Sequence, residues 1–440
     1  MGISLLPVNE SSEPPSRMSN NGQSDLAIFR ILERESATVP AIENLEAEIH
    51  SALSGLDLLR EKLIGRSIGV TVGSRGVASV KEIAHGICAW LKSQGASPFV
   101  FPAMGSHGGA TAEGQLKILE EYGVTEQFIG APIRASMETV ALGETPEGVP
   151  VFMDRLAAQS DGVVVMNRVK PHTTFSGTVE SGLLKMMAVG MGKEDGARAF
   201  HAAARKLGYE KNIRALSATV LASGKILCGV GVIENEMHRI CAVRAARPEG
   251  MVALDETCLA QARHRVPRIP FPKFQLLMVD EIGKNISGTG MDSKVIGRGV
   301  ALPPGEAPEI GLIYARDLTE PSGGNALGVG LADFVHQRLR DKIDFEKMYV
   351  NARVSMSHHL VRLPMVMPSD RDALAFALAS LNRPAPAEQS VVWIKSTQNL
   401  GRMAISERLA REASTLAGWK LSENVFQPQL DAEGNLVSFA

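Results

Sequence analysis

Four residues with chemically versatile side chains lie in three Gly-rich stretches of the chain. The stretches read GSHGGAT with His107, NRVKPHTTFSG with His172, and GLLKMMAVGMGKEDGARAFH with Lys185 and His201. Histidine exchanges protons near neutral pH and binds metals through either ring nitrogen, and a lysine amine can carry a covalent adduct. These residue types therefore indicate acid–base or redox-like chemistry on a small substrate, with a candidate metal ligand and a candidate covalent anchor.

Short apolar runs alternate with helical patterns from about residue 66 onward. The runs SIGVTVG, SPFVFPAM, VPVFMD and GVVVMNRV are typical of strands, whereas residues 77–91 carry apolar side chains at helical spacing. A second helix is expected in TAEGQLKILEEYG, with Thr111 as its N-cap. Strands that alternate with helices predict parallel βαβ units with right-handed crossovers.

This arrangement places several candidates at one edge of the predicted sheet. Arg75, His107 and His172 each follow a predicted strand, and ligands of open α/β sheets bind beyond the carboxyl ends of the strands. Lys185 and His201 fall on the helices that follow. The guanidinium of Arg75 suits a substrate carboxylate, although a surface arginine in a polar turn is the alternative interpretation.

The chain is expected to form two α/β domains. Residues 1–24 are polar and predict a disordered extension. Residues 25–268 predict an N-terminal, Rossmann-like domain with a mostly parallel sheet, which holds the cofactor and the catalytic residues. Three prolines near residues 263–274 mark a boundary, and residues 269–440 predict a smaller C-terminal α/β domain that closes over the substrate, with the active site in the cleft. In its DEIGKNISGTGMD stretch, Lys284 is a candidate second contact for the substrate.

Composition argues against several other classes of protein. The chain has 440 residues, a net charge of −2 and four cysteines. The balanced charge predicts no nucleic-acid partner, and no apolar run is long enough to predict a membrane span. The cysteines form no C-x-x-C pair, and no secretory signal is evident, so a cytoplasmic protein is expected. The G-x-G of GMGKEDG lacks the full dinucleotide-binding pattern.

The order, types and rough spacing of these residues resemble the nickel-dependent lactate racemase family. That family has an arginine after the first strand, a histidine in a Gly/Thr-rich loop, a Pro-His after a later strand, then a lysine, then a histidine on a helix. The matching positions here are Arg75, His107, His172, Lys185 and His201. The resemblance covers about residues 65–205 and is weaker beyond them.

The resemblance implies racemisation or epimerisation of a 2-hydroxy acid through a nickel-pincer nucleotide tethered to Lys185. It implies hydride transfer to and from that cofactor, with His107 and His172 as the acid and base on opposite faces of the substrate and His201 as the nickel ligand. Ser176 and Gly177 are expected to contact the cofactor. The expected partners are the small 2-hydroxy acid and the enzymes that synthesise the cofactor.

In the same interpretation, Arg75 and Lys284 bind the substrate. Its identity stays open between lactate and a larger hydroxy acid, such as a sugar acid or a malate-like compound. Two other functions also stay open. One is a hydrolase or lyase that uses a simple divalent metal, and the other is a non-catalytic protein that binds the cofactor or an organic acid.

Overall fold

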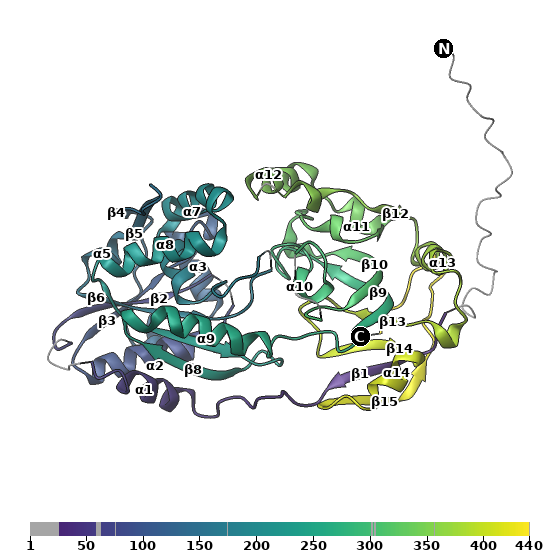
Figure 1. Cartoon of the computed structure of the whole chain (residues 1–440), viewed down its shortest axis with the longest axis horizontal. Coiled ribbons are helices and arrows are strands. Elements are labelled where there is room, and N and C mark those ends of the chain that lie inside the picture. Colours follow the sequence, from purple (N-terminus) through teal and green to yellow (C-terminus); the bar gives the residue numbers. More distant parts are fainter. Residues whose placement is uncertain are drawn as a thin grey trace, which may run out of the picture. The chain divides into compact units, whose positions relative to one another are not determined.

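The computed structural model describes residues 26–58, 63–74, 76–173, 175–300, 302, 305–355 and 357–439. The predicted extension at residues 1–24 therefore lies outside the described residues. The chain forms two compact units (Figure 1). The N-terminal unit comprises Ser36–Pro267 with Val300–Leu302, and the C-terminal unit comprises the remaining residues on both sides of it. The protein is a mixed α/β protein, as the sequence predicted.

The N-terminal unit is built on a five-stranded sheet with the strand order β3-β2-β6-β7-β8. The first four strands are parallel, and β8 pairs antiparallel with β7. The bounds are Ser67–Val72 for β2, Ser97–Pro102 for β3, Gly162–Arg168 for β6, Ile226–Glu234 for β7 and Ile240–Ala246 for β8.

Helices cover both faces of this sheet. Val163 and Val165 of β6 join one apolar cluster, whereas Val164 and Met166 join another, because successive strand side chains point to opposite faces. One face packs against α1 (Leu45–Ser54), α2 (Val80–Ser93), α3 (Ala112–Glu121) and α4 (Glu126–Ile129). The other packs against α6 (Leu183–Lys185), α7 (Lys193–Leu207), α8 (Tyr209–Ala222) and α9 (Met251–Arg263).

The predicted N-terminal elements are confirmed with one exception. Thr111 caps α3, because its hydroxyl accepts a hydrogen bond from the Gly114 amide. The run VPVFMD does form a strand, β5 (Pro150–Asp154), but it pairs antiparallel with β4 (Thr139–Glu144) in a separate two-stranded sheet. Its expected place in a parallel βαβ unit was therefore wrong. Five residues separate β4 from β5, which is too few for a crossover helix.

The C-terminal unit contains an eight-stranded mixed sheet with the order β12-β11-β10-β9-β13-β14-β1-β15. Strands β12 through β13 are parallel, and the remaining pairings are antiparallel. The strand bounds are Lys273–Ile282 for β9, Glu309–Leu318 for β10, Phe334–His336 for β11, Met365–Met367 for β12, Val391–Ile394 for β13, Arg402–Ser406 for β14 and Trp419–Phe426 for β15. Its helices are α10 (Ser293–Ile296), α11 (Gln337–Asp341), α12 (Phe345–Ser355), α13 (Asp370–Ser380) and α14 (Glu407–Ala413).

The first strand of the chain belongs to the C-terminal unit. Strand β1 (Phe29–Arg34) lies between β14 and β15 and pairs antiparallel with both. The sequence-based boundary instead assigned these residues to an N-terminal domain beginning at residue 25. A contiguous boundary could not reveal this, because the partners of β1 lie at the opposite end of the chain. Among the described residues, no helix combines the length and apolar character that a membrane crossing requires.

Candidate active site

The loop that carries His107 follows β3 and is shaped by glycines in the left-handed region. Gly105, Gly108 and Gly109 have φ values of 56°, 68° and 65°, which residues with a Cβ adopt at a cost. The exposed His107 ring contacts the Met104 carbonyl oxygen through Nδ1 at 2.8 Å. Because a carbonyl can only accept, Nδ1 carries the proton in the neutral ring, and Nε2 is its basic nitrogen. The Gly105 amide also donates to the Gly190 carbonyl, 3.1 Å away, which lies just beyond Lys185.

The loop that carries His172 follows β6 and is organised around one buried carboxylate. Glu180 is 0% exposed and accepts hydrogen bonds from the amides of His172 at 2.6 Å and Gly177 at 3.1 Å. The Arg263 guanidinium of α9 forms an ion pair with the same carboxylate at 2.7 Å and also donates to the Gly177 carbonyl. Glu180 therefore fixes the backbone of this loop at both of these positions.

A row of aromatic rings connects His172 with His201. The His172 ring lies 4.6 Å from the Phe175 ring, which stacks on Tyr209 at 4.9 Å. Tyr209 in turn contacts Phe200 at 6.0 Å, and Phe200 contacts the His201 ring edge-to-face at 5.2 Å. Aromatic contacts have preferred geometries, so the row limits the orientations that the His172 and His201 rings can adopt.

Lys185 ends a short helical turn, α6, which continues directly into a π-helix at Met186–Gly190. The buried Asp255 carboxylate of α9 accepts hydrogen bonds from the first two amides of this turn, those of Leu183 at 3.0 Å and Leu184 at 2.8 Å. Burial raises the pKa of Asp255 to about 7. The hydrogen bonds from the two amides and the charge of Arg214 act in the opposite direction. π-Helical turns are rare and occur frequently at functional sites.

Lys185 and His201 lie close enough to interact electrostatically. Partial desolvation, and then the Lys185 ammonium, lower the pKa of the His201 imidazole below its usual value. A neutral imidazole is the form that ligates a metal. In the part of the chain that the structure describes, no group of three or more His, Cys, Asp or Glu side chains is placed to hold a metal ion. The groups that interact here are the His201 imidazole and the Lys185 ammonium.

The other candidates have separate positions. Arg75 lies outside the described residues. Ser176 is exposed, whereas the amide and carbonyl of Gly177 bond to Glu180 and Arg263. Lys284 belongs to the C-terminal unit, where its ammonium donates to the Gly288 carbonyl at 2.6 Å. The structure therefore brings together the segments of His107, His172, Lys185 and His201 within the N-terminal unit.

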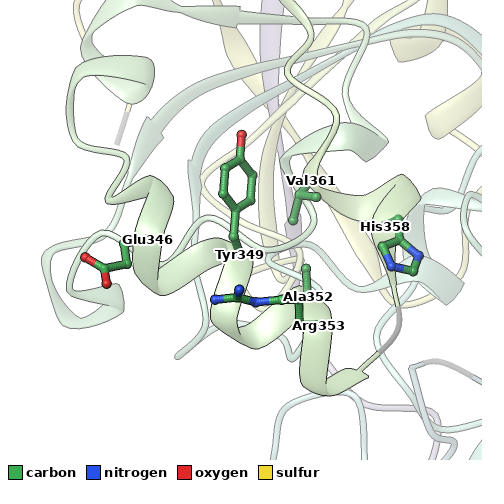
Figure 2. Close-up of a pocket in the computed structure, with 6 residues that line it drawn as sticks. All are labelled: Glu346, Tyr349, Ala352, Arg353, His358 and Val361. Carbon is green, nitrogen blue, oxygen red and sulfur yellow. The ribbon is translucent and has the colours of Figure 1, made fainter.

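The C-terminal unit has a pocket of about 620 Å³ on α12 and the short helix after it (Figure 2). No residue predicted from the sequence lines it. Its lining residues are Glu346, Tyr349, Ala352, Arg353, His358 and Val361.

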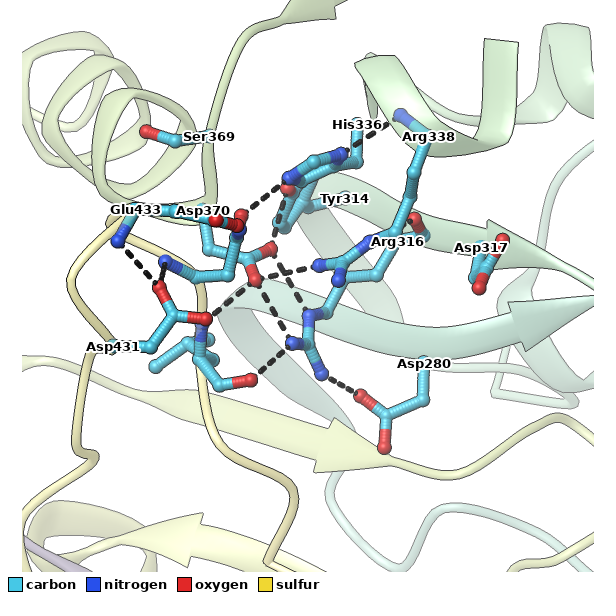
Figure 3. Close-up of polar contacts among 12 residues, drawn as sticks. Asp280, Tyr314, Arg316, Asp317, His336, Arg338, Ser369, Asp370, Asp431 and Glu433 are labelled. Atoms are coloured by element: carbon cyan, nitrogen blue, oxygen red, sulfur yellow. Dashed lines mark hydrogen bonds and ion pairs between the residues drawn. The ribbon is translucent and has the colours of Figure 1, made fainter. Parts of the chain in front are cut away.

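The same unit contains a buried polar network centred on Asp370 (Figure 3). This carboxylate accepts from Tyr314 at 2.6 Å, from Arg316 and Arg338, and from the Leu436 amide at 2.8 Å. Hydrogen bonding to these cations and to Tyr314 outweighs desolvation and lowers the pKa of Asp370 to about 2. The network ties the C-terminal segment to β10 and is a structural feature.

Sequence reasoning missed the residues that hold the candidate loops in place. Glu180 and Asp255 look like ordinary helix or loop acids in the sequence, yet each is buried against backbone amides. The one available signal was the position of Glu180 inside SGTVESG, a run of small residues in which a lone acid is unusual.

Comparison with known proteins finds a family model that matches part of this chain. Residues 25–210 match the model of the lactate racemase N-terminal domain. This stretch of the chain is therefore similar to the N-terminal domain of lactate racemase. The matched stretch includes His107, His172, Lys185 and His201, whereas Lys284 lies beyond it.

A search of solved structures found a distant likeness. The lactate racemase apoprotein from Thermoanaerobacterium thermosaccharolyticum is similar over 85% of this chain and 89% of that chain, with 14% sequence identity and a TM-score of 0.45. No curated protein showed detectable similarity in sequence.

Proposed function

We propose that this protein racemises or epimerises a 2-hydroxy acid, with His107 and His172 as its acid–base pair. The family match over residues 25–210 supports the racemase or epimerase role. The observation that carries the proposal is the packing of the His107, His172, Lys185 and His201 segments within one unit. Oxidation of the substrate hydroxyl releases a proton and the return reduction takes one up, and two histidines can supply the base and the acid.

The residues present fit the nickel-pincer nucleotide of the lactate racemase family. His201 would bind the nickel, because imidazole suits this metal and its lowered pKa keeps the ring neutral at pH 7. Lys185 would carry the covalent bond, at a turn held by Asp255. When bound, this group supplies the acceptor and donor of the substrate's α-hydrogen, which no protein side chain provides.

The protein's own residues would orient the substrate and move its hydroxyl proton. Because His107 bonds the Met104 carbonyl through Nδ1, its Nε2 is the atom that takes or returns this proton. His172 would perform the opposite transfer from a loop fixed by Glu180. Arg75 and Lys284 would bind the substrate carboxylate or hydroxyl, a role that suits a guanidinium and an ammonium.

A simple divalent-metal hydrolase would require a different set of protein ligands. Such an enzyme typically uses about three protein ligands at its metal, whereas the described side chains bring no such group together. A non-catalytic binding protein is distinguished by its indifference to the loss of the proton-transfer histidines.

The test is intact-protein mass spectrometry with metal analysis after co-expression with the cofactor-synthesis enzymes. We expect an adduct of nucleotide mass on Lys185 and about one nickel per chain. The Lys185→Met variant should lose the adduct, and the His201→Ala variant should lose nickel. An unmodified wild-type chain without nickel, beside a loaded family member as control, would contradict the proposal.

A further inference from the structure

Lys193 is a fully buried cation at the start of α7, the helix that carries His201. Its side chain and that of Asp154 are both 0% exposed, and they form an ion pair at 2.9 Å. The same ammonium donates to the Pro102 carbonyl at the end of β3 and to Oε1 of Gln115 at 3.1 Å. Lys193 also has a φ of 52°, in the left-handed region that a lysine rarely adopts. A buried charge in a strained conformation is costly, so its surroundings must hold it firmly.

Gln115 connects this cation to the loop of His107. It is 0% exposed, and its Nε2 donates to the Gly105 carbonyl at 2.9 Å and to the His107 carbonyl at 3.2 Å. The Lys193 ammonium can only donate, so it requires the amide oxygen of Gln115 to face it. The amide nitrogen must then face the two loop carbonyls. The charge of Lys193 thereby determines which way Gln115 bonds to the loop.

The network also joins elements that carry different candidate residues. Asp154, the partner of Lys193, caps α5 (Arg155–Gln159) through its Oδ1, and its own amide donates to the Met191 carbonyl, beyond the Lys185 turn. The ends of β3 and β5, the start of α7 and the His107 loop therefore meet at one buried ion pair. In the sequence, Lys193 is part of GMGKEDG, which carries no nucleotide-binding pattern.

We propose that Gln115 and Lys193 are positioning residues for His107, which fix its loop relative to the helix of His201. This inference rests on the proposed function for its catalytic consequence, but the anchoring of the loop is measurable without activity. A misplacement of about 1 Å can cost a catalytic group about a hundredfold in rate. The effect of losing the anchor should therefore fall on kcat rather than on substrate binding.

The decisive variant is Gln115→Glu, which keeps an oxygen for Lys193 but cannot donate to the two loop carbonyls. Gln389→Met is the control, because Gln389 is also buried and bonded to backbone groups, but in the C-terminal unit. The measurements are hydrogen–deuterium exchange of residues 104–111, the NMR chemical shift of the His107 ring, the adduct on Lys185, and kcat and KM. Where Gln115→Glu fails to fold, Gln115→Ala removes the same donor without adding a charge.

We expect Gln115→Glu to exchange at least about tenfold faster across residues 104–111 and to lose at least about tenfold in kcat, with the Lys185 adduct intact and KM within about threefold of wild type. Gln389→Met should match wild type in loop exchange and kcat. Unchanged exchange, faster exchange with unchanged kcat, or an equal kcat loss in Gln389→Met would each overturn the proposal. If the loaded wild-type protein isomerises no 2-hydroxy acid, the proposed function fails. Separately, an unchanged NMR chemical shift of the His107 ring in Gln115→Glu would overturn the anchoring of the loop.

Discussion

The imidazoles of His172 and His201 lie at the two ends of one continuous row of aromatic rings, Phe175, Tyr209 and Phe200. His172 comes from a loop after β6 and His201 from the middle of α7. The row therefore links the positions of two candidate residues through ring packing. Tyr209, at the start of α8, contacts both neighbouring rings and is the central member.

Tyr209→Leu should weaken both the fold and the proposed activity. Losing two ring contacts of about 0.5–1.5 kcal/mol each predicts about 1–3 kcal/mol lower stability, together with a lower kcat. Tyr209→Phe keeps the ring and should stay within about 0.5 kcal/mol of wild type. Urea unfolding of the two variants checks this, and an equal loss in both would show that the hydroxyl, not the row, matters.

Glu180→Gln should destabilise the His172 loop. The neutral amide cannot pair with Arg263 and satisfies the two loop amides less well, which predicts a loss of roughly 2–3 kcal/mol for charged hydrogen bonds. Glu256→Gln is the matched control, because Glu256 is 41% exposed in its ion pair with Arg214, and the expected loss is below about 1 kcal/mol. Chemical denaturation measures both, and equal losses would refute a special role for Glu180.

Lys185→Met should raise the pKa of His201, because the Lys185 ammonium is one of the two causes that lower it. Lys206→Met, in the last turn of the same helix, should leave the pKa of His201 at its wild-type value. An NMR titration of the His201 ring resonances measures both variants. Identical titration curves in wild type and Lys185→Met would show that the two side chains do not interact.

Because of Asp255, the free energy of unfolding of the protein should fall as pH rises. Its folded pKa of about 7 lies above the ordinary value of an unfolded aspartate, about 3.9, so the folded state retains a proton that the unfolded state releases between these values. The stabilising contribution is complete below about pH 4 and is lost by about pH 7. Relative to wild type, Asp255→Asn should gain about 4 kcal/mol in unfolding free energy between pH 4 and pH 8. Parallel pH–stability curves would contradict this expectation.

The sequence predicted the central sheet of the N-terminal unit well, because buried parallel strands and amphipathic helices have distinct periods. β2, β3, β6, α2 and α3 all appear where those periods placed them. The pairing of β1 with strands near the other end of the chain left no local signal. The place of β5 in a hairpin was missed because a short apolar run reads alike in either kind of sheet.

In the candidate site too, some residues have a local signal in the sequence and others do not. His107, His172, Lys185 and His201 are detectable because their residue types stand out among glycines and small residues. Gln115, Lys193, Glu180 and Asp255 are polar residues whose burial arises only from tertiary packing. In a sequence, such residues cannot be told apart from the polar residues of the solvent-exposed surface, where polar residues are most often found.

The most direct test is chiral chromatography of enantiomerically pure 2-hydroxy acids, lactate and larger compounds, incubated with the cofactor-loaded protein. The wild type should interconvert the two configurations of at least one compound. His107→Ala and His172→Ala, both with the Lys185 adduct intact, should lose roughly 10²–10⁴-fold in rate, the usual contribution of acid–base catalysis. A loaded wild type that leaves every compound optically pure, or histidine variants that match its rate, would contradict the proposed acid–base pair.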